Sequence, residues 1–312
     1  MSKTGRSPVH IYRGTTGLNT KVDAAEIPLD YKTGISDLPL AINADISSRG
    51  RLGRRPGFTA RRSSEAWHSL FSDGDTALGI YNNALYRIAR NFTVKGIRSS
   101  LTPEARTAYV KVFGEVFYAN GHENGVVRGD TSYAWESATL PTGQVDRTRH
   151  LVAPPVGQIL GYLGGRIFIG KDRTLWWTDP FAYYHCDLGQ NNIPFSEELT
   201  MIAPVNDGMF VGVGGQTIFL RGRDPKAFEY EETDTTAVPI PGTAVRIDPK
   251  YLPAGAGISS GIAWLWTSSK GLCLGGRGGA YNNVTLQRLD IPAALTGAGV
   301  VVGNKYIVSL TP

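Results

Sequence analysis

Residues 159–177, with the sequence ILGYLGGRIFIGKDRTLWW, decide the fold. An apolar run at 159–163 is followed by Gly164 and Gly165, a second apolar run centred on Phe168, and a third run at 174–177. β-Branched and aromatic residues favour strands, and glycine favours the tight turns between them. The stretch therefore predicts a β-hairpin followed by a further, outer strand.

The same unit of strand, turn and strand recurs along the chain. The centre of its second apolar run falls, in order, at Tyr86, Phe117, Phe168, Phe210, Cys273 and Ile307. Successive centres lie 31, 51, 42, 63 and 34 residues apart, which averages to roughly the length of one four-stranded propeller blade. Because a single blade cannot bury both faces of its sheet, such units stack into a ring.

We therefore predict an all-β fold, a β-propeller of about six blades over residues 63–312. A β-sandwich or a pair of smaller β domains is the alternative, because ordinary hairpins also give uneven spacing. Residues 300–310 supply only about two strands, so the last blade is expected to need another strand, with the segment after Arg62 as the candidate.

Two segments differ from the repeats. Residues 1–62 are polar and punctuated by proline, and they are expected to form an extended N-terminal arm. Residues 223–257 contain the acidic stretch EYEETD, at 229–234, followed by a stretch rich in proline and glycine. This segment is expected to be a long loop between blades.

Composition limits the class of protein. No apolar run approaches the roughly 20 residues that span a bilayer, so no membrane insertion is expected. The first residues lack the apolar stretch of a secretory signal, which indicates synthesis and assembly in a cytoplasm. Cys186 and Cys273 lie in strand-like apolar surroundings and are expected to be buried thiols. The net charge of +5 permits a negatively charged partner without requiring one.

Motifs for catalysis are weak. The sequence GISSG at 257–261 has the spacing of a nucleophile elbow, but it lacks the preceding strand and the following helix. The sequence SDGDT at 72–76 faintly resembles the aspartate box of sialidase propellers, occurs once, and is expected to be a β-turn. The five histidines have no metal-ligand spacing. We expect no catalytic, cofactor-binding or metal-binding residues and no enzymatic activity.

The strongest charge signal is a set of six arginines in fourteen residues with no acidic residue among them: Arg49, Arg51, Arg54, Arg55, Arg61 and Arg62. They form either a solvated loop that contacts neighbouring blades or chains, or a contact with DNA phosphates or an acidic partner. Few aromatic residues lie among them, so base-specific recognition gains no support.

Two blocks of the sequence carry a resemblance to a known family. The first contains GLNT at 17–20, PL at 28–29, LAINADI at 40–46 and GRLGRRPGF at 50–58. The second contains GRIFIG at 165–170, LWWTDP at 175–180, DGMFVG at 207–212 and FLRGRDP at 219–225. In these blocks the chain resembles the β-propeller proteins of tailed-bacteriophage virions, which are the tail nozzle, hub or packaged-DNA stabilisation proteins.

The resemblance implies a structural component of the phage tail, in a ring around the DNA path or at the tail tip. It implies a homo-oligomeric ring, contacts with other phage tail proteins and non-specific contact with genomic DNA, in a virion assembled in the host bacterial cytoplasm. It carries over no catalytic residue. The chain is compact beside the longer nozzle proteins, which puts in doubt the domains that contact adaptors and fibres.

Two functions therefore remain open. The first is the structural ring subunit, in which the acidic stretch at 229–234 pairs with the arginines of a neighbouring copy. The second is a receptor-binding or glycan-binding propeller at the tail tip that uses Trp176, Trp177, Tyr183 and Tyr184. For these four aromatics, burial in a blade is the alternative interpretation.

Overall fold

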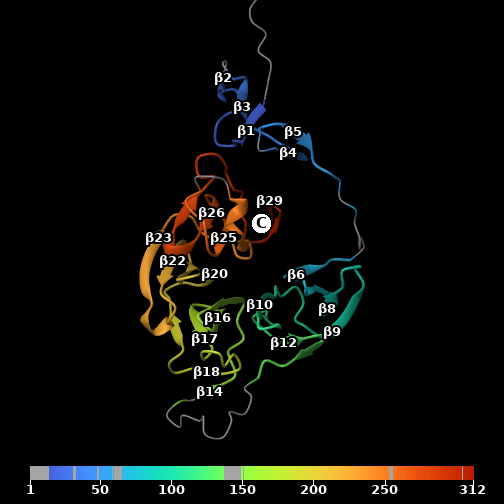
Figure 1. Cartoon of the computed structure of the whole chain (residues 1–312), viewed down its shortest axis with the longest axis vertical. Helices are drawn as coiled ribbons and strands as arrows, with labels where there is room; N and C mark the ends of the chain where they lie inside the picture. The colour runs from blue at the N-terminus through green and yellow to red at the C-terminus, as the bar shows by residue number, and fades with distance from the viewer. Residues whose placement is uncertain are drawn as a thin grey trace, which may run out of the picture.

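The computed structural model describes residues 14–30, 33–47, 49–57, 59, 65–136, 149, 151–252, 256–303 and 305–312. Five four-stranded antiparallel sheets follow one another along this part of the chain, and a two-stranded sheet comes last. Figure 1 shows the sheets arranged around a common centre. The protein is an all-β propeller, as the recurring hairpins predict.

Each of the first three blades is built from hairpins in sequence order. The first blade contains β6 (His68–Ser72), β7 (Ala77–Tyr81), β8 (Ala84–Ile88) and β9 (Val94–Arg98). The second contains β10 (Ala108–Val112), β11 (Glu115–Ala119), β12 (Asn124–Arg128) and β13 (Thr131–Tyr133). The third contains β15 (Ile159–Leu163), β16 (Arg166–Lys171), β17 (Thr174–Trp177) and β19 (Asn192–Pro194). A small sheet of β14 (Leu151–Val152) and β18 (Cys186–Asp187) accompanies the third blade.

The remaining sheets continue the series of blades. The fourth blade contains β20 (Leu199–Val205), β21 (Gly208–Val213), β22 (Gln216–Arg221) and β23 (Glu229–Asp234). The fifth contains β24 (Val245–Ile247), β25 (Ala263–Ser268), β26 (Gly271–Gly275) and β27 (Tyr281–Asn283). The sixth sheet has only β28 (Thr296–Val302) and β29 (Lys305–Thr311). In the part of the chain that the structure describes, three 3-10 helices lie in the connections: Pro225–Ala227, Pro249–Tyr251 and Arg277–Gly279.

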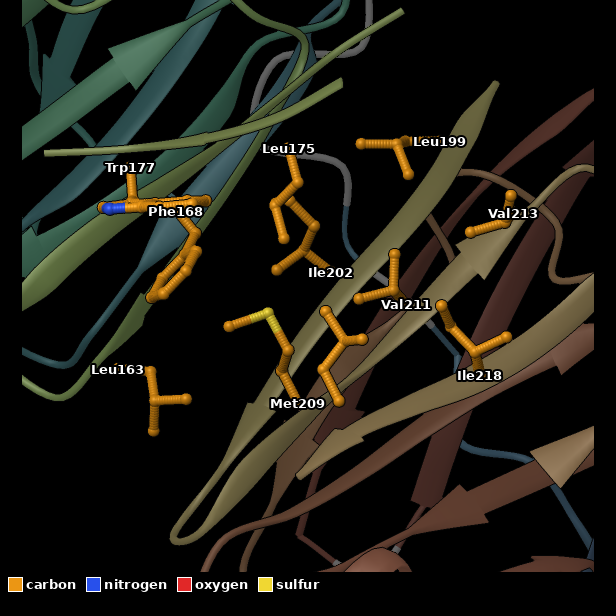
Figure 2. Packing of buried hydrophobic residues seen from close by; sticks show 11 residues of the cluster. Leu163, Phe168, Leu175, Trp177, Leu199, Ile202, Met209, Val211, Val213 and Ile218 are labelled. Carbon is orange, nitrogen blue, oxygen red and sulfur yellow. The ribbon is translucent and has the colours of Figure 1, made fainter. Parts of the chain in front are cut away.

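A separate cluster of buried apolar residues joins each blade to the next. Figure 2 shows the cluster between the third and fourth blades, where Phe168 and Leu175 face Ile202 and Met209. Similar clusters join the first to the second blade, the second to the third, the fourth to the fifth, and the fifth to the sixth sheet. Among the described residues, no buried cluster combines the sixth sheet with the first blade.

The prediction that the segment after Arg62 supplies a strand to the last blade was wrong. The segment after Arg62 leads into β6, which pairs with β7 in the first blade. Strand β6 pairs with β7, the next strand in the sequence, because Phe71 of β6 packs into the cluster that joins the first and second blades. The sixth sheet therefore keeps two strands within the described residues.

The N-terminal arm contains short strands of its own. Strands β1 (Gly14–Leu18), β2 (Leu29–Asp30) and β3 (Ile35–Leu38) form one small sheet, and β4 (Ala44–Ile46) and β5 (Leu52–Arg54) form another. Figure 1 shows this part outside the ring, beyond the sixth sheet. Polar residues dominate it, so these sheets are held together mainly by hydrogen bonds and ion pairs.

The loop expected over 223–257 also contains regular structure. Residues 229–234 form β23, which pairs with β22 as the outer strand of the fourth blade. The sequence did not predict this strand because residues 229–234 lack an apolar run. An outer strand can nevertheless carry charged side chains on its exposed face. Strand β24 and two of the 3-10 helices occupy more of the same segment.

Candidate interaction surface

The arginine set lies largely on one hairpin of the arm. Strands β4 and β5 pair in register from Ala44 with Arg54 to Ile46 with Leu52. Ser47 closes the connecting loop, because its carbonyl oxygen accepts from the Gly50 amide at 2.9 Å and its hydroxyl accepts from the Arg51 amide at 3.0 Å. The loop and β5 thus place several arginines close together on the surface.

The four arginines in the described residues, Arg49, Arg51, Arg54 and Arg55, are all exposed. Arg55 donates to Asp45 at 3.2 Å, and Lys305 contacts the same carboxylate. Within the described residues, no carboxylate pairs with any of the other three. Arg61 and Arg62 lie outside the described residues. The hairpin therefore presents at least three solvated guanidinium groups.

A glycine fixes this hairpin to the rest of the arm. Gly50 accepts a hydrogen bond from the Thr15 amide at 2.8 Å and has a φ of 72°. A Cβ atom at Gly50 would lie 2.6 Å from the backbone oxygen of Thr15. Only glycine tolerates both the left-handed conformation and this close approach.

Ion pairs and hydrogen bonds attach the arm to the last part of the ring. Asp37 contacts Arg288 and accepts from Asn19 at 2.9 Å, and the Thr20 amide donates to the Arg288 carbonyl at 2.8 Å. Burial acts to raise the pKa of Asp37, but hydrogen bonds from Thr16 and Asn19 and the charge of Arg288 outweigh it and hold that pKa below its usual value. The folded arm therefore favours the ionised carboxylate.

The acidic stretch at 229–234 is already partly engaged. Glu231 pairs with Arg221 of the adjacent strand at 2.6 Å. Asp234 accepts a hydrogen bond from the Tyr281 hydroxyl at 2.5 Å, which connects the fourth and fifth blades. Glu229 and Glu232 are exposed, so these two carboxylates are the ones open to a neighbouring chain.

The four aromatics proposed for glycan binding pack within the blades. Trp177 is only 3% exposed and belongs to the cluster between the third and fourth blades. Trp176, Tyr183 and Tyr184 are partly buried against the cluster between the second and third blades. The alternative interpretation, burial in a blade, is therefore the one observed. Trp176 and Trp177 are adjacent residues of β17 and face the two neighbouring blades, whereas Tyr183 and Tyr184 lie in the connection before β18.

A different aromatic residue borders a surface hollow. Phe181 is 71% exposed and, with Tyr162, lines a cavity of about 510 Å³ at the turns of the third and fourth blades. Arg166, Arg223 and Asp224 provide its charged groups. Sequence reasoning missed it, because it depends on turns far apart in the chain.

Both cysteines are buried, as expected. Burial raises the pKa of Cys186 to about 12 and also raises the pKa of Cys273, so neither thiol is a ready nucleophile.

At the turn of residues 72–76, Asp73 accepts hydrogen bonds from the amides of Asp75 and Thr76 at 2.9 and 2.7 Å, which confirms the predicted turn. In the described residues, no three histidine, cysteine or acidic side chains are grouped to hold a metal ion, and no helix could cross a membrane.

No protein-family model and no curated protein matches this chain. Among solved structures, the WD40 domain of Pan2 from Neurospora crassa is 10% identical with a TM-score of 0.43, over 67% of this chain and 61% of that one. The N-terminal domain of Nup159 is 11% identical with a TM-score of 0.44, over 77% of this chain and 71% of that one. Virginiamycin B lyase from Staphylococcus aureus is 10% identical with a TM-score of 0.42, over 78% and 84%.

The likeness to these structures concerns the fold alone. The chain spans 61% of the Pan2 domain and 29% of an extracellular domain of a two-component system from B. thetaiotaomicron. These structures belong to proteins of different kinds.

Proposed function

We propose that the chain is a structural, non-enzymatic subunit of a bacteriophage tail, in a homo-oligomeric ring that contacts other tail proteins and genomic DNA. The observation that carries this proposal is the exposed arginine hairpin of the arm, with Arg49, Arg51 and Arg54 free of carboxylate partners in the described residues. The resemblance of the two sequence blocks to virion propellers supports it.

Contact with DNA fits the chemistry of this hairpin. Guanidinium groups bind phosphate oxygens and displace condensed counterions, so the affinity falls as salt rises. The hairpin offers charge without exposed aromatic residues of its own in the described residues, which favours binding to the phosphate backbone over reading of bases.

Salt-dependent DNA binding tests this role. We expect the wild-type chain to bind duplexes of unrelated sequence equally, and the triple variant of Arg49, Arg51 and Arg54 to alanine to bind more weakly. The slope of log K against log salt should become shallower by about 0.9 for every phosphate that the variant no longer neutralises. A triple alanine variant of the exposed Arg90, Arg173 and Arg246 makes the same change in charge on the blades and should bind as the wild type does. Equal weakening in both variants would argue against a dedicated surface.

Assembly is tested by light scattering followed by imaging of any particle. A symmetric ring, or incorporation into a tail, is the expected result. If neighbouring copies pair arginine with Glu229 and Glu232, then reversing the charge of Arg54 and Arg55 should weaken that assembly. If the charge-reversed variant still assembles, the proposed pairing of these arginines with Glu229 and Glu232 between copies is excluded.

The hollow beside Phe181 favours a second function, which is binding of a host receptor or glycan at the tail tip. An exposed aromatic ring suits stacking on a sugar, and Arg223 suits contact with the carboxylate of an acidic sugar, whereas Arg166 already pairs with Asp224 at 3.5 Å. Binding on a glycan array that Phe181→Ala and Arg223→Ala abolish, with no ring formed, would favour this function.

A further inference from the structure

The outer strand of each four-stranded blade carries a feature that discourages another strand from pairing with it. Strands β13, β19 and β27 have only 3 residues each, and β19 contains Pro194. Strand β9 contains Lys95 and has an irregular register with β8. Strand β23 has four acidic side chains and an irregular register with β22. Short length, charge, proline and bulges are the devices that protect sheet edges.

Strand β29 lacks these devices. It has 7 residues, and all of them pair with β28 without a shift in register. Its single charged residue, Lys305, lies at its first position and pairs with Asp45 of the arm. Ile307 is 40% exposed and Val308 is 36% exposed. In the described residues β29 has no second partner strand, so it has a long, regular edge that no described strand covers.

The sequence of β29 is complementary to itself in antiparallel pairing. With Val308 opposite Val308 of another copy, Tyr306 faces Leu310 and Ile307 faces Ser309, while Lys305 faces Thr311. Apolar residues therefore meet apolar residues on the face that packs toward the fifth blade, and no like charges are opposed. Tyr306 belongs to the cluster on that face.

We propose that β29 pairs with β29 of a second copy of this chain, antiparallel about Val308. The two hairpins would then form one sheet of four strands, which is the number in each of the other five blades. The same surface serves both partners, so a two-fold axis relates the copies. Pairing of this kind requires no particular role in a virion.

Light scattering of the full chain at increasing concentration tests the proposal. As the concentration rises we expect a species of twice the 33.7 kDa mass of one chain to form before any larger ring does. In the variant Ile307→Lys with Ser309→Lys, two lysines of one copy oppose two of the other, and we expect at least a tenfold loss of dimer affinity. In the variant Ile307→Lys with Ser309→Glu, each lysine opposes a glutamate, so the dimer should persist.

These two variants change the same exposed positions, so a difference between them reports on pairing between copies and not on folding. Leu295→Lys, at a 79% exposed position before β28, is the control away from the edge and should dimerise normally. Hydrogen exchange should show β29 amides more protected in the dimer than in the double-lysine variant. A wild-type chain that stays monomeric, or a dimer that both double variants leave equally intact, would overturn the proposal.

Discussion

Phe117, Phe168 and Phe210 lie in the second strands of three successive blades, and each is fully buried. Each side chain packs in the cluster that joins its blade to a neighbour. Large aromatic residues thus contribute to every one of these three interfaces, each within a cluster of several buried apolar residues.

Truncation of Phe210 should therefore be costly. The ring of Phe210 lies 4.8 Å from that of Phe219 and 5.6 Å from that of Trp266. We expect Phe210→Ala to lower the free energy of unfolding by about 3–5 kcal/mol, because it leaves a cavity between the fourth and fifth blades. Leu295→Ala, at an exposed position, should change it by less than about 0.5 kcal/mol. Urea denaturation of both variants measures the difference, and similar values would contradict this view of the interface.

At the scale of elements, the arm depends on polar contacts. Within the described residues, three ion pairs attach it to the end of the ring: Asp37 with Arg288, Asp45 with Lys305, and Lys21 with Asp290. The connection to β6 attaches it covalently to the first blade. The arm thus links the first and last parts of the ring, although none of its described residues belongs to the buried clusters between blades.

The Asp37 contact predicts a pH dependence of stability. Because the pKa of Asp37 is lowered on folding, its contribution is fully present above the unfolded pKa of about 3.9 and is lost as pH falls through the folded value. We expect Asp37→Asn to cost about 1 kcal/mol at pH 7, and to cost little at a pH well below that range. Urea denaturation at both pH values tests this. The control Asp75→Asn removes a largely exposed carboxylate and should have less effect at either pH.

At the scale of the whole molecule, the ring is not equally buried throughout. The second to fifth blades have a buried cluster on both faces, whereas the first blade has one on a single face among the described residues. Leu70, on β6, is 67% exposed, and Val300 and Val302 on β28 are 49% and 59% exposed. The ring therefore has a weakly joined position between its first and last sheets.

The first blade, which has one buried interface, should be locally less stable than the blades that have two. We expect amide hydrogens of β7 and β8 to exchange faster than those of β16 and β21, because the first blade opens without disrupting a second buried interface. Hydrogen exchange followed by mass spectrometry of the double-lysine variant measures this without a contribution from dimers. Equal protection of the first and fourth blades would show that the last sheet packs against the first blade in solution.

The sequence by itself determined the all-β class and the positions of the repeats. All six predicted centres lie in strands, because apolar runs and turn residues are local signals. Part of their uneven spacing arises because Tyr86 and Cys273 lie in third strands, whereas Phe117, Phe168 and Phe210 lie in second strands. The arginine cluster was also visible, since its members are close in sequence.

Only the tertiary structure decided the rest. Which strand joins which sheet, where the acidic stretch of β23 lies, and how Asp37 meets Arg288 all depend on contacts between residues far apart in the chain. The unpaired edge of β29 is also a feature that only the tertiary structure decided. The sequence of a strand indicates that a strand forms, but it does not indicate whether both of its edges pair with other strands. Burial of Trp177 likewise follows from the neighbouring blade, which supplies the apolar surface that covers it.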